Sequence, residues 1–484
     1  MTRSHSSHDQ HAFTHWQPRV REGVTVLSRR NMLKAGWAGV AGLSLPTLLR
    51  AREAASAAGQ SLNKKSVILL WMTGGPSHID TWDMKPNRPL SNRGPFSPIE
   101  TAVPGVFVCE HLPRQAAMMD RFTLLRSVDC KGSSHQPNQV MQTANREAAP
   151  RRNPKGNRYP AMGSVIAQHR AGQGNGAIPP YVVFQRDPTH VAWAGWLGKE
   201  YDPFDANQAV KLPALDLVGK PLGKTSGGNL LQAPVGLTQE RLTDRRLLTE
   251  DFDRLRRGLD QSGSMDALDR FGQQAFEMML GRKAQEAFDL TREDPAVRAK
   301  YGDHLWCQQT LLARRLVEAG VSFVTIDLSY HTASGTWDTH GDNIPPYGGI
   351  TKGLGPLLPL FDHLLTTLVG DLETRGLLDD VLIVAMGEFG RSPAIGTQQS
   401  TDGRDHWPVV MSACLAGGGL QHGRVIGGTS PDGGEVADRP VTPADLAATI
   451  YKFMGVPLDL TYLDDRQRPR YIVDETGQPI NELF

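Results

Sequence analysis

Cysteine is scarce in this chain of 484 residues, and no two cysteines form a CxxC pair. The four that occur are Cys109, Cys130, Cys307 and Cys414. Four scattered cysteines are too few for a disulfide scaffold, and their spacing excludes a zinc site made of cysteines. Any metal that the protein binds must therefore be held by histidine and carboxylate side chains.

An excess of charge of one sign is also missing. Lysine and arginine number 52 and aspartate and glutamate 51, which leaves a formal net charge of +1 at pH 7. This balance excludes a protein that binds polyanions through bulk charge, so we expect no nucleic-acid partner. After the N-terminal region, no segment free of charge and proline reaches the roughly 20 residues of a membrane-spanning helix. We therefore expect no stable membrane anchor.

The N-terminal region has the ordered features of an export signal. A polar stretch leads to the segment 28–34, SRRNMLK, which contains Arg29 and Arg30, and an apolar run over 35–49 and small residues over 54–58 follow. This order resembles a twin-arginine signal. We predict a signal peptide over 1–58, the twin-arginine export machinery as a partner, and a mature domain over 59–484 that is periplasmic or secreted.

Strand-like and helix-like segments alternate after this signal. Short apolar runs predict buried strands, and longer runs with helical periodicity predict helices. Such alternation indicates an α/β fold with a largely parallel sheet and helices on both faces. We expect one large domain with a helical insertion near 237–290. The predicted strands are 66–72, 121–128, 180–184, 321–327 and 380–386, and the predicted helices are 136–146, 237–259, 265–290, 304–319 and 357–375.

Polar residues that can bind metals follow the ends of four of these strands. In open α/β sheets, ligands bind beyond the carboxyl ends of the strands, so these residues are candidates for a site. Mixed imidazole and carboxylate ligands suit Zn²⁺, Mn²⁺ or Fe better than Ca²⁺. The alternative is that residues 338–340 form a hydrogen-bond pair within a loop and that Asp405 and His406 lie in a surface turn. The segments are GGPSHIDTWD (74–83), DCKGSSH (129–135), WDTHGDN (337–343), GEFGRS (387–392) and GRDHWP (403–408).

Taken together, these motifs resemble a known family. The leader, GGPSHIDTWDMKP, WDTHGDN, GEFGRSP and GRDHWP are similar to the bacterial secreted family called domain of unknown function fifteen-zero-one, over essentially the whole mature chain. That family is grouped with the alkaline phosphatase and sulfatase superfamily. The resemblance implies an alkaline phosphatase-like fold and a site for a divalent metal, for which zinc, manganese, iron and calcium are considered.

The resemblance also implies roles for individual residues. Glu388 takes the place of the aspartate in the superfamily's Asp-His-Gly motif, and Phe389 replaces the histidine that follows it. That replacement removes one expected ligand of a second metal. The metal ligands implied in this way are Asp80, Asp338, His340, Glu388, Asp405 and His406.

A nucleophile and an anion-binding arginine complete the implied site. Ser134 precedes a predicted helix, where the superfamily places its serine or threonine, and Ser133 and His135 are close rivals. Arg404 or Arg391 could hold an ester oxygen in a bidentate fork. No cysteine or nearby serine lies in a C/S-x-P-x-R motif, so classical formylglycine sulfatase chemistry is not expected. The implied catalytic residues are Ser134, His135 and Arg404.

The function expected from these residues is hydrolysis of phosphate or sulfate esters by a secreted, metal-dependent enzyme. The substrate would be an anionic ester. A sulfated or phosphorylated polysaccharide would suit the tryptophans near the site loops, although tryptophans at strand ends more often pack in a core. The alternative is a non-catalytic binding or structural protein of the cell envelope whose superfamily site has degenerated, which the replacement at Phe389 favours.

Overall fold

The computed structural model describes residues 65–134, 139–171, 178–210, 212, 282–329, 336–343, 348–396, 399–473 and 476–484. The predicted signal peptide over 1–58 and nearly all of the predicted insertion near 237–290 lie outside these residues, so both stay predictions. No described helix combines the length and the hydrophobicity that a membrane crossing requires.

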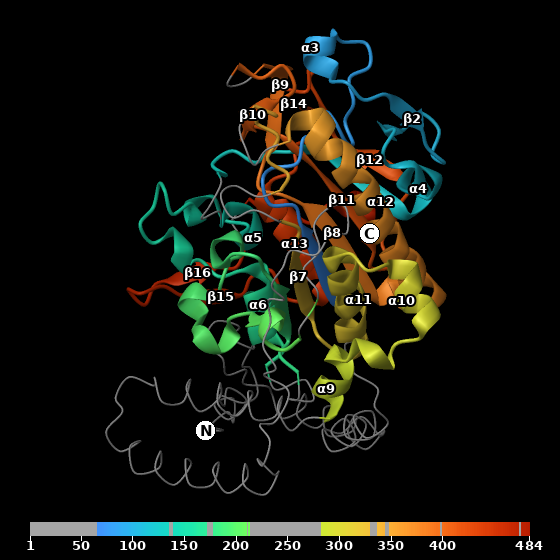
Figure 1. Cartoon of the computed structure of the whole chain (residues 1–484). Coiled ribbons are helices and arrows are strands. Elements are labelled where there is room, and N and C mark those ends of the chain that lie inside the picture. Colours follow the sequence, from blue (N-terminus) through green and yellow to red (C-terminus); the bar gives the residue numbers. More distant parts are fainter. Residues whose placement is uncertain are drawn as a thin grey trace, which may run out of the picture. The chain divides into compact units, whose positions relative to one another are not determined.

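An eight-stranded sheet forms the centre of the fold (Figure 1), in the order β12-β4-β11-β8-β1-β7-β5-β6. Strand β1 pairs in parallel with β7 and β8, and β5 pairs in parallel with β6 and β7. Strand β11 runs antiparallel to both of its neighbours, β4 and β8. The strands are β1 (Ser66–Trp71), β4 (Phe122–Val128), β5 (Tyr181–Phe184), β6 (Phe204–Asp205), β7 (Phe323–Asp327), β8 (Val381–Met386), β11 (Met411–Gly417) and β12 (Arg424–Ile426).

The predicted α/β class and largely parallel sheet are confirmed. Each of the five predicted strands is present within two residues of its predicted bounds. The sequence prediction missed β11, whose segment MSACLAG is buried along its whole length. Small residues dominate that segment, and they lack the β-branched and aromatic side chains that mark strands.

Helices cover both faces of the sheet, as predicted, and β1 shows why. Its alternate side chains Ile68 and Leu70 belong to a buried cluster with residues of α11 and α12, whereas Val67 and Leu69 belong to a second cluster with residues of α6 and α13. Because side chains alternate between the two faces of a strand, a strand that is covered on both faces is apolar throughout. The helices that cover the sheet are α6 (Met162–His169), α11 (Leu305–Glu318), α12 (Gly355–Thr374) and α13 (Pro443–Met454).

Two of these helices begin at residues whose side chains cap them. The His304 side chain accepts a hydrogen bond from the backbone N–H of Trp306 at the start of α11. Thr442 and Asp445 form a capping box at the start of α13, and Gly455 ends that helix in a left-handed conformation. The shorter described helices are α3 (Leu90–Arg93), α4 (Pro113–Ala117), α9 (Arg282–Phe288) and α10 (Pro295–Tyr301).

The helix predicted over 136–146 is much shorter in the structure. Helix α5 covers Val140–Thr143 alone, and Ala144 follows it with a left-handed backbone, φ 54°. The described chain therefore has no long helix that starts near Ser134. A helix dipole gives no support to Ser134 as a nucleophile, because a helix of four residues has little dipole of its own.

Four small two-stranded sheets accompany the central sheet. The pair β9 and β10 matters most for the site, because β9 follows β8 closely and the pairing sets His406 opposite Arg391. The strands are β2 (Pro98–Glu100) with β3 (Phe107–Cys109), β9 (Gly390–Ile395) with β10 (Arg404–Trp407), β13 (Gly428–Thr429) with β14 (Val436–Asp438), and β15 (Thr461–Leu463) with β16 (Pro469–Tyr471).

Candidate metal centre

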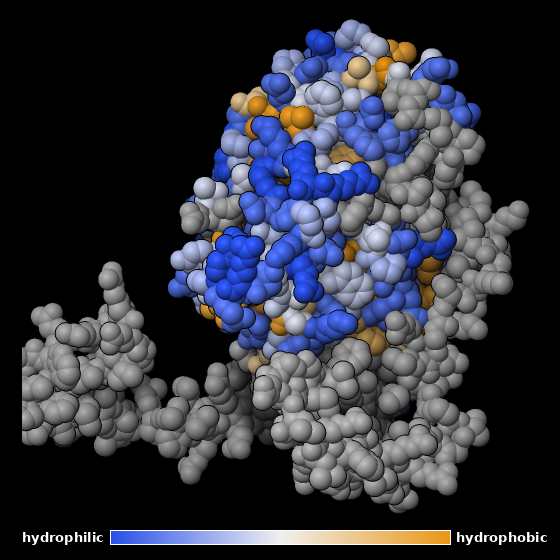
Figure 2. Space-filling model, turned by 90° about the vertical axis from the view of Figure 1, so that its left-hand side faces the viewer, coloured by the Kyte–Doolittle hydropathy of each residue, from blue (hydrophilic) through white to orange (hydrophobic). Residues whose placement is uncertain are grey.

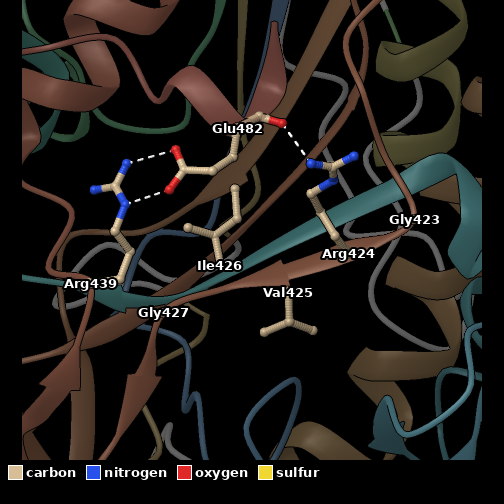
Figure 3. Close-up of a pocket in the computed structure, with 7 residues that line it drawn as sticks. All are labelled: Gly423, Arg424, Val425, Ile426, Gly427, Arg439 and Glu482. Atoms are coloured by element: carbon tan, nitrogen blue, oxygen red, sulfur yellow. Dashed lines mark hydrogen bonds and ion pairs between the residues drawn. The ribbon is translucent and has the colours of Figure 1, made fainter.

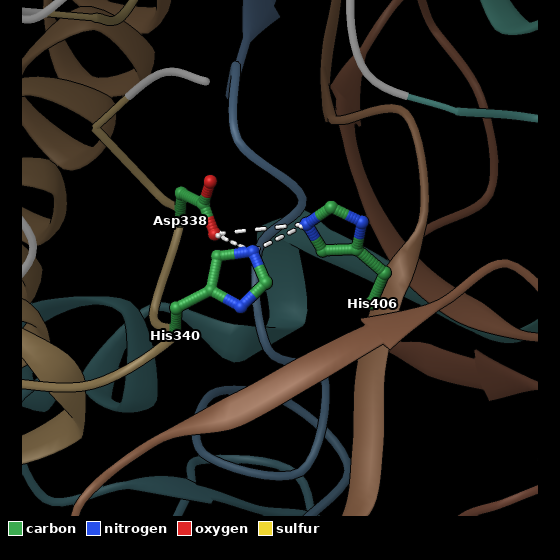
Figure 4. Close-up of side chains that lie close together, drawn as sticks. All are labelled: Asp338, His340 and His406. Atoms are coloured by element: carbon green, nitrogen blue, oxygen red, sulfur yellow. Dashed lines mark hydrogen bonds and ion pairs between the residues drawn. The ribbon is translucent and has the colours of Figure 1, made fainter. Parts of the chain in front are cut away.

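Three of the predicted ligands converge beyond the carboxyl ends of β1 and β8 (Figure 4). The Nε2 atom of His340 lies 2.6 Å from Nε2 of His406 and 3.3 Å from Oδ1 of Asp338. The same Asp338 oxygen lies 4.0 Å from His406 Nε2. One ligand atom of each residue lies within 4.8 Å of the other two. Two imidazole nitrogens and a carboxylate oxygen thus face one another in a group that could hold a metal ion.

The chemistry of these donors fits a divalent transition metal. Two neutral imidazole nitrogens 2.6 Å apart can share only one proton, whereas a cation would bind both lone pairs with the two rings moved slightly apart. Two histidines and one carboxylate suit Zn²⁺, Mn²⁺ or Fe²⁺, and calcium, which prefers oxygen ligands alone, fits this set least well.

The exposure of the three side chains increases from Asp338 to His406. The Asp338 side chain is fully buried, that of His340 is 10% exposed and that of His406 is 34% exposed. Solvent therefore reaches the centre from the His406 side. A substrate would approach a metal held here from that side.

The end of β1 positions Asp338 through an unusually close approach of two backbone segments. Gly74 has φ 122°, and a Cβ at this position would lie 2.5 Å from the backbone nitrogen of Asp338. The backbone N–H of Trp337 donates to the Thr73 carbonyl at 3.1 Å. Only glycine allows this approach, because both the backbone angle and the space exclude a side chain. The GG pair of the first motif thus brings Asp338 to the edge of the sheet.

Arg391 fixes the orientation of Asp338. Its Nη2 lies 2.6 Å from Asp338 Oδ1, and both side chains are fully buried. The same guanidinium donates to the carbonyl oxygens of Gly74 and Gly75 and, at 3.2 Å, to that of Arg404. Arg391 therefore fixes the position of the Asp338 carboxylate, and the hydrogen bonds of its guanidinium are made within the fold.

Phe389, for whose position the resemblance implied a histidine, packs against the centre. Its ring centroid lies 4.9 Å from that of His406, and the residue is fully buried. A Cβ at Gly75 would lie 2.5 Å from this ring. The Phe389 ring therefore packs against the His406 imidazole and restricts its movement.

Glu388 and Asp405 lie near the three ligands but outside the group. Glu388 is 2% exposed, and its Oε1 accepts a hydrogen bond of 2.8 Å from the backbone N–H of Gly74. Asp405 has a side chain that is 59% exposed, and its Oδ1 lies 3.6 Å from Nδ1 of His340. Glu388 thus holds the end of β1, and Asp405 faces the outer side of the His340 ring.

Asp80 and Arg404 form a buried ion pair with each other. Arg404 donates from Nε to Asp80 Oδ2 at 2.7 Å and from Nη2 to Oδ1 at 3.1 Å, and neither side chain is exposed. The remaining N–H groups of Arg404 donate to the carbonyl oxygens of Asn92, Ser392 and Pro393. All five N–H groups are therefore used, so the structure gives Asp80 the place of a structural anchor and leaves Arg404 no donor for a substrate.

The loop that carries Ser134 lies at the same edge of the sheet. The Sγ atom of Cys130 lies 4.0 Å from the carbonyl oxygen of Trp407, the residue after His406. Ser133 is buried, and the partly exposed Ser134 accepts a hydrogen bond of 3.1 Å from Arg151. His135 lies outside the described residues. Ser134 remains a predicted nucleophile, and its loop lies near Trp407, the residue after His406.

Sequence reasoning missed a buried pair of histidine and aspartate. Asp327 ends β7, and its Oδ2 lies 2.7 Å from Nδ1 of His190, with both side chains fully buried. The Thr73 hydroxyl donates to the other oxygen of Asp327 at 2.6 Å. A charged residue at the end of a predicted apolar strand was the available signal for Asp327, whereas nothing in the local sequence marked His190.

The tryptophans divide between core and surface. Trp82 and Trp337 are about 1% exposed or less, and their indole N–H groups donate to Gln115 and to the Leu328 carbonyl. These two rings are core residues and are closed to a sugar. Trp193 and Trp407 are partly exposed.

A pocket of about 440 Å³ lies elsewhere, along the edge strand β12 (Figure 3). Arg439 forms a two-pronged ion pair with Glu482, at 2.6 and 2.8 Å, and Arg424 donates to the Glu482 backbone carbonyl. The charged groups that line this pocket thus bind one another.

The sequence of this chain matches the model of the family described as "Protein of unknown function (DUF1501)" over residues 64–484. The chain belongs to this family. The family that the motifs predicted is thereby confirmed. No curated protein matches the chain.

Three solved structures illustrate what the fold is similar to. The PsFucS1 sulfatase from Pseudoalteromonas sp. shares 11% identity over 84% of this chain and 70% of its own, with a TM-score of 0.34. A phosphonate monoester hydrolase of Agrobacterium radiobacter shares 14% over 86% and 76%, with a TM-score of 0.32. The C-terminal periplasmic domain of EcEptC from Escherichia coli, in complex with Zn, shares 11% over 87% and 92%, with a TM-score of 0.31. TM-scores near 0.3 are too low to assign an activity.

Proposed function

We propose that this protein is a metal-dependent hydrolase of phosphate or sulfate esters that works outside the cytoplasm. The convergence of Asp338, His340 and His406 at the carboxyl edge of the sheet carries the proposal. Metal-assisted ester hydrolysis uses such a centre, which is open to solvent on one side. The export signal predicted over 1–58 supports a periplasmic or secreted location.

Each residue of the centre has a distinct task in this proposal. Asp338, His340 and His406 would hold the ion, and Arg391 keeps the Asp338 carboxylate oriented. A divalent ion bound there supplies Lewis acidity toward an ester oxygen. Phe389 keeps the His406 ring in place through its packing.

Ser134 is the proposed nucleophile. Arg151 Nη1 donates to its Oγ at 3.1 Å, and a nearby positive charge favours the deprotonated hydroxyl. Its loop contacts the carbonyl of Trp407, which follows a proposed ligand in the chain. The proposed substrate is an anionic ester on a sulfated or phosphorylated polysaccharide.

The test is turnover of a panel of aryl phosphate, aryl phosphodiester and aryl sulfate esters by purified mature protein. We expect at least one ester to be hydrolysed, chelator to abolish the rate, and zinc or manganese to restore it. We expect Ser134→Ala to reduce kcat by at least about a hundredfold, in the range known for loss of a nucleophile. The metal content of that variant should equal that of wild type. Rates that are unaffected by chelator would contradict the proposal.

One observation favours a second candidate, a non-catalytic protein of the cell envelope. Arg391 occupies Asp338 Oδ1 at 2.6 Å, the same oxygen that faces both histidines, and such an ion pair can hold a loop together without chemistry. Under this reading, metal-loaded protein would hydrolyse none of the esters. The turnover panel therefore separates the two candidates.

A further inference from the structure

A cationic segment lies beside the Ser134 loop. Residues 146–158 contain five arginine and lysine side chains and one acidic residue, Glu147. Four of the five cations, together with Lys131 of the loop itself, are exposed. In a chain with a net charge of +1, this concentration of positive charge is local. The cations of the segment are Arg146, Arg151, Arg152, Lys155 and Arg158.

Three of these arginines lie against the loop that carries the proposed nucleophile, and Arg146 donates to the backbone carbonyls of Asp129 and Lys131. Arg151 Nη1 donates to Ser134 Oγ at 3.1 Å. Arg152 Nη1 lies 3.6 Å from the position that a Cβ on Gly132 would occupy, so its guanidinium lies over the loop. Both side chains belong to exposed residues. They therefore present positive charge to solvent next to Ser134.

Three neighbouring carboxylates in the described part of the chain bind other groups. Asp129 pairs with Arg146 at 3.1 Å, and Asp465 pairs with Lys155. Glu147 accepts a hydrogen bond of 3.1 Å from the Tyr159 hydroxyl. Among the described residues, no carboxylate forms an ion pair with Arg152. Its charge is available for a ligand from outside the chain.

The backbone of the segment is built to hold these arginines in place. The N–H groups of Arg152 and Asn153 both donate to the Ala149 carbonyl, at 2.9 and 2.8 Å, and the Asn153 side chain donates to the Glu147 carbonyl. Gly156 packs so closely that a Cβ there would lie 2.7 Å from the Pro150 nitrogen. A fixed backbone lowers the entropy cost of binding through long side chains.

The arginines that the sequence suggested for anion binding cannot serve this purpose. Arg404 uses all its N–H groups within the fold, and Arg391 binds Asp338 and three backbone carbonyls. An anionic substrate would still need a cation near the reacting group. Figure 2 shows that the face of the molecule on the left of Figure 1, where α5 lies, is largely hydrophilic.

We propose that Arg151 and Arg152 form a binding site for a sulfate or phosphate group on a glycan substrate. Guanidinium groups bind such tetrahedral oxyanions in a bidentate manner. This inference rests on the proposed hydrolase function, and it assigns the recognition of the substrate's anion to two residues outside the metal centre.

The test is binding of short oligomers of dextran sulfate, dextran phosphate and plain dextran to chelator-treated protein, measured by calorimetry. We expect both charged oligomers to bind wild type and plain dextran not to bind. Arg151→Ala/Arg152→Ala should weaken binding by about tenfold or more and should make it less sensitive to salt. Whichever charged oligomer binds more tightly identifies the ester class.

The matched control is Arg298→Ala/Lys300→Ala, which removes two exposed cations from α10. It should leave binding within about twofold of wild type, since bulk charge falls equally in both variants. An equal loss of affinity for the charged oligomers in the two double variants, or tight binding of plain dextran, would overturn the inference. Tighter arginine-dependent binding of duplex DNA or of anionic lipid vesicles than of the glycans would also overturn it.

Chelator treatment separates this inference from the proposed function. Binding is measured without turnover, so a chain that binds sulfated glycans through Arg151 and Arg152 but hydrolyses no ester retains the site and loses the hydrolase proposal. Unchanged melting temperature and metal content in the metal-loaded double variant would confirm that the loss of binding is local.

Discussion

Two carboxylates at the same edge of the sheet have opposite surroundings. Asp80 faces a guanidinium whose five N–H groups are all bonded within the fold. The Oδ1 atom of Asp338 faces both one arginine and the Nε2 nitrogens of two histidines. Both were predicted as metal ligands, yet their neighbours differ in kind.

The difference shows what decides between a structural carboxylate and a ligand. A buried carboxylate needs a partner, and a fully bonded arginine satisfies it inside the fold. Imidazoles are neutral for much of the physiological pH range and can bind either a proton or a metal. The histidines therefore give the Asp338 region a chemistry that the Asp80 region lacks.

The largest predicted effect comes from breaking the structural pair. Arg404→Ala leaves the buried Asp80 carboxylate without its partner, which typically costs about 3–5 kcal/mol. We expect the free energy of unfolding in urea to fall by this amount. Metal bound per folded chain should stay unchanged, because Asp80 is not a ligand in this account.

The control for that variant is an exposed ion pair of similar geometry. Arg439 and Glu482 lie 2.6 Å apart with side chains 38% and 39% exposed, so Arg439→Ala should cost no more than about 1 kcal/mol. If Arg404→Ala were as stable as Arg439→Ala and bound less metal, the result would indicate that Asp80 is a metal ligand.

A smaller loss of stability is predicted for breaking the pair that His190 forms with Asp327, the third carboxylate at this edge. Burial alone would lower the pKa of His190, but the hydrogen bond and charge of Asp327 raise it above the ordinary value of 6.5. The pair therefore stabilises the fold below about pH 6.5 and loses this contribution as pH rises through the raised pKa. His190→Gln should cost on the order of 1.5–3 kcal/mol at low pH, as for hydrogen bonds to charged groups.

The difference in unfolding free energy between wild type and His190→Gln should thus narrow as pH rises from 5.5 to 9. The contribution of His78 to stability should depend on pH in the opposite direction. Its burial lowers its pKa, so the neutral ring stabilises the fold above pH 6.5 and this contribution is lost as pH falls. For His78→Gln, the difference from wild type should narrow toward low pH. A His190→Gln difference that widened with pH would show that the ring is neutral in the fold.

The sheet was predictable because its signals are local. Apolar runs such as 66–72 and 380–386 report burial on both faces, and each became a strand close to its predicted bounds. Strand β11 was missed because its small residues lack the β-branched and aromatic side chains that mark strands, although both helix layers help to bury it. The helix over 136–146 was overpredicted, because a periodic pattern cannot show that Ala144 adopts a left-handed backbone.

The site was predictable in part, and the limit is the choice of partners. Motif spacing identified Asp338, His340 and His406 as candidates, and the structure brings them together. Spacing could not show that Arg404 binds Asp80, which lies 324 positions away in the sequence. Long-range pairing depends on the packed fold, so a single sequence does not reveal which charged residues satisfy one another.

The most direct test of the central claim is an anomalous-diffraction map from crystals of the protein loaded with zinc. We expect one strong peak per chain, bounded by Asp338 Oδ1, His340 Nε2 and His406 Nε2. His406→Ala should remove this peak, whereas His363→Ala, which changes a histidine of α12, should leave it. A peak at Asp80, or no peak at the two histidines in wild-type crystals, would contradict the account.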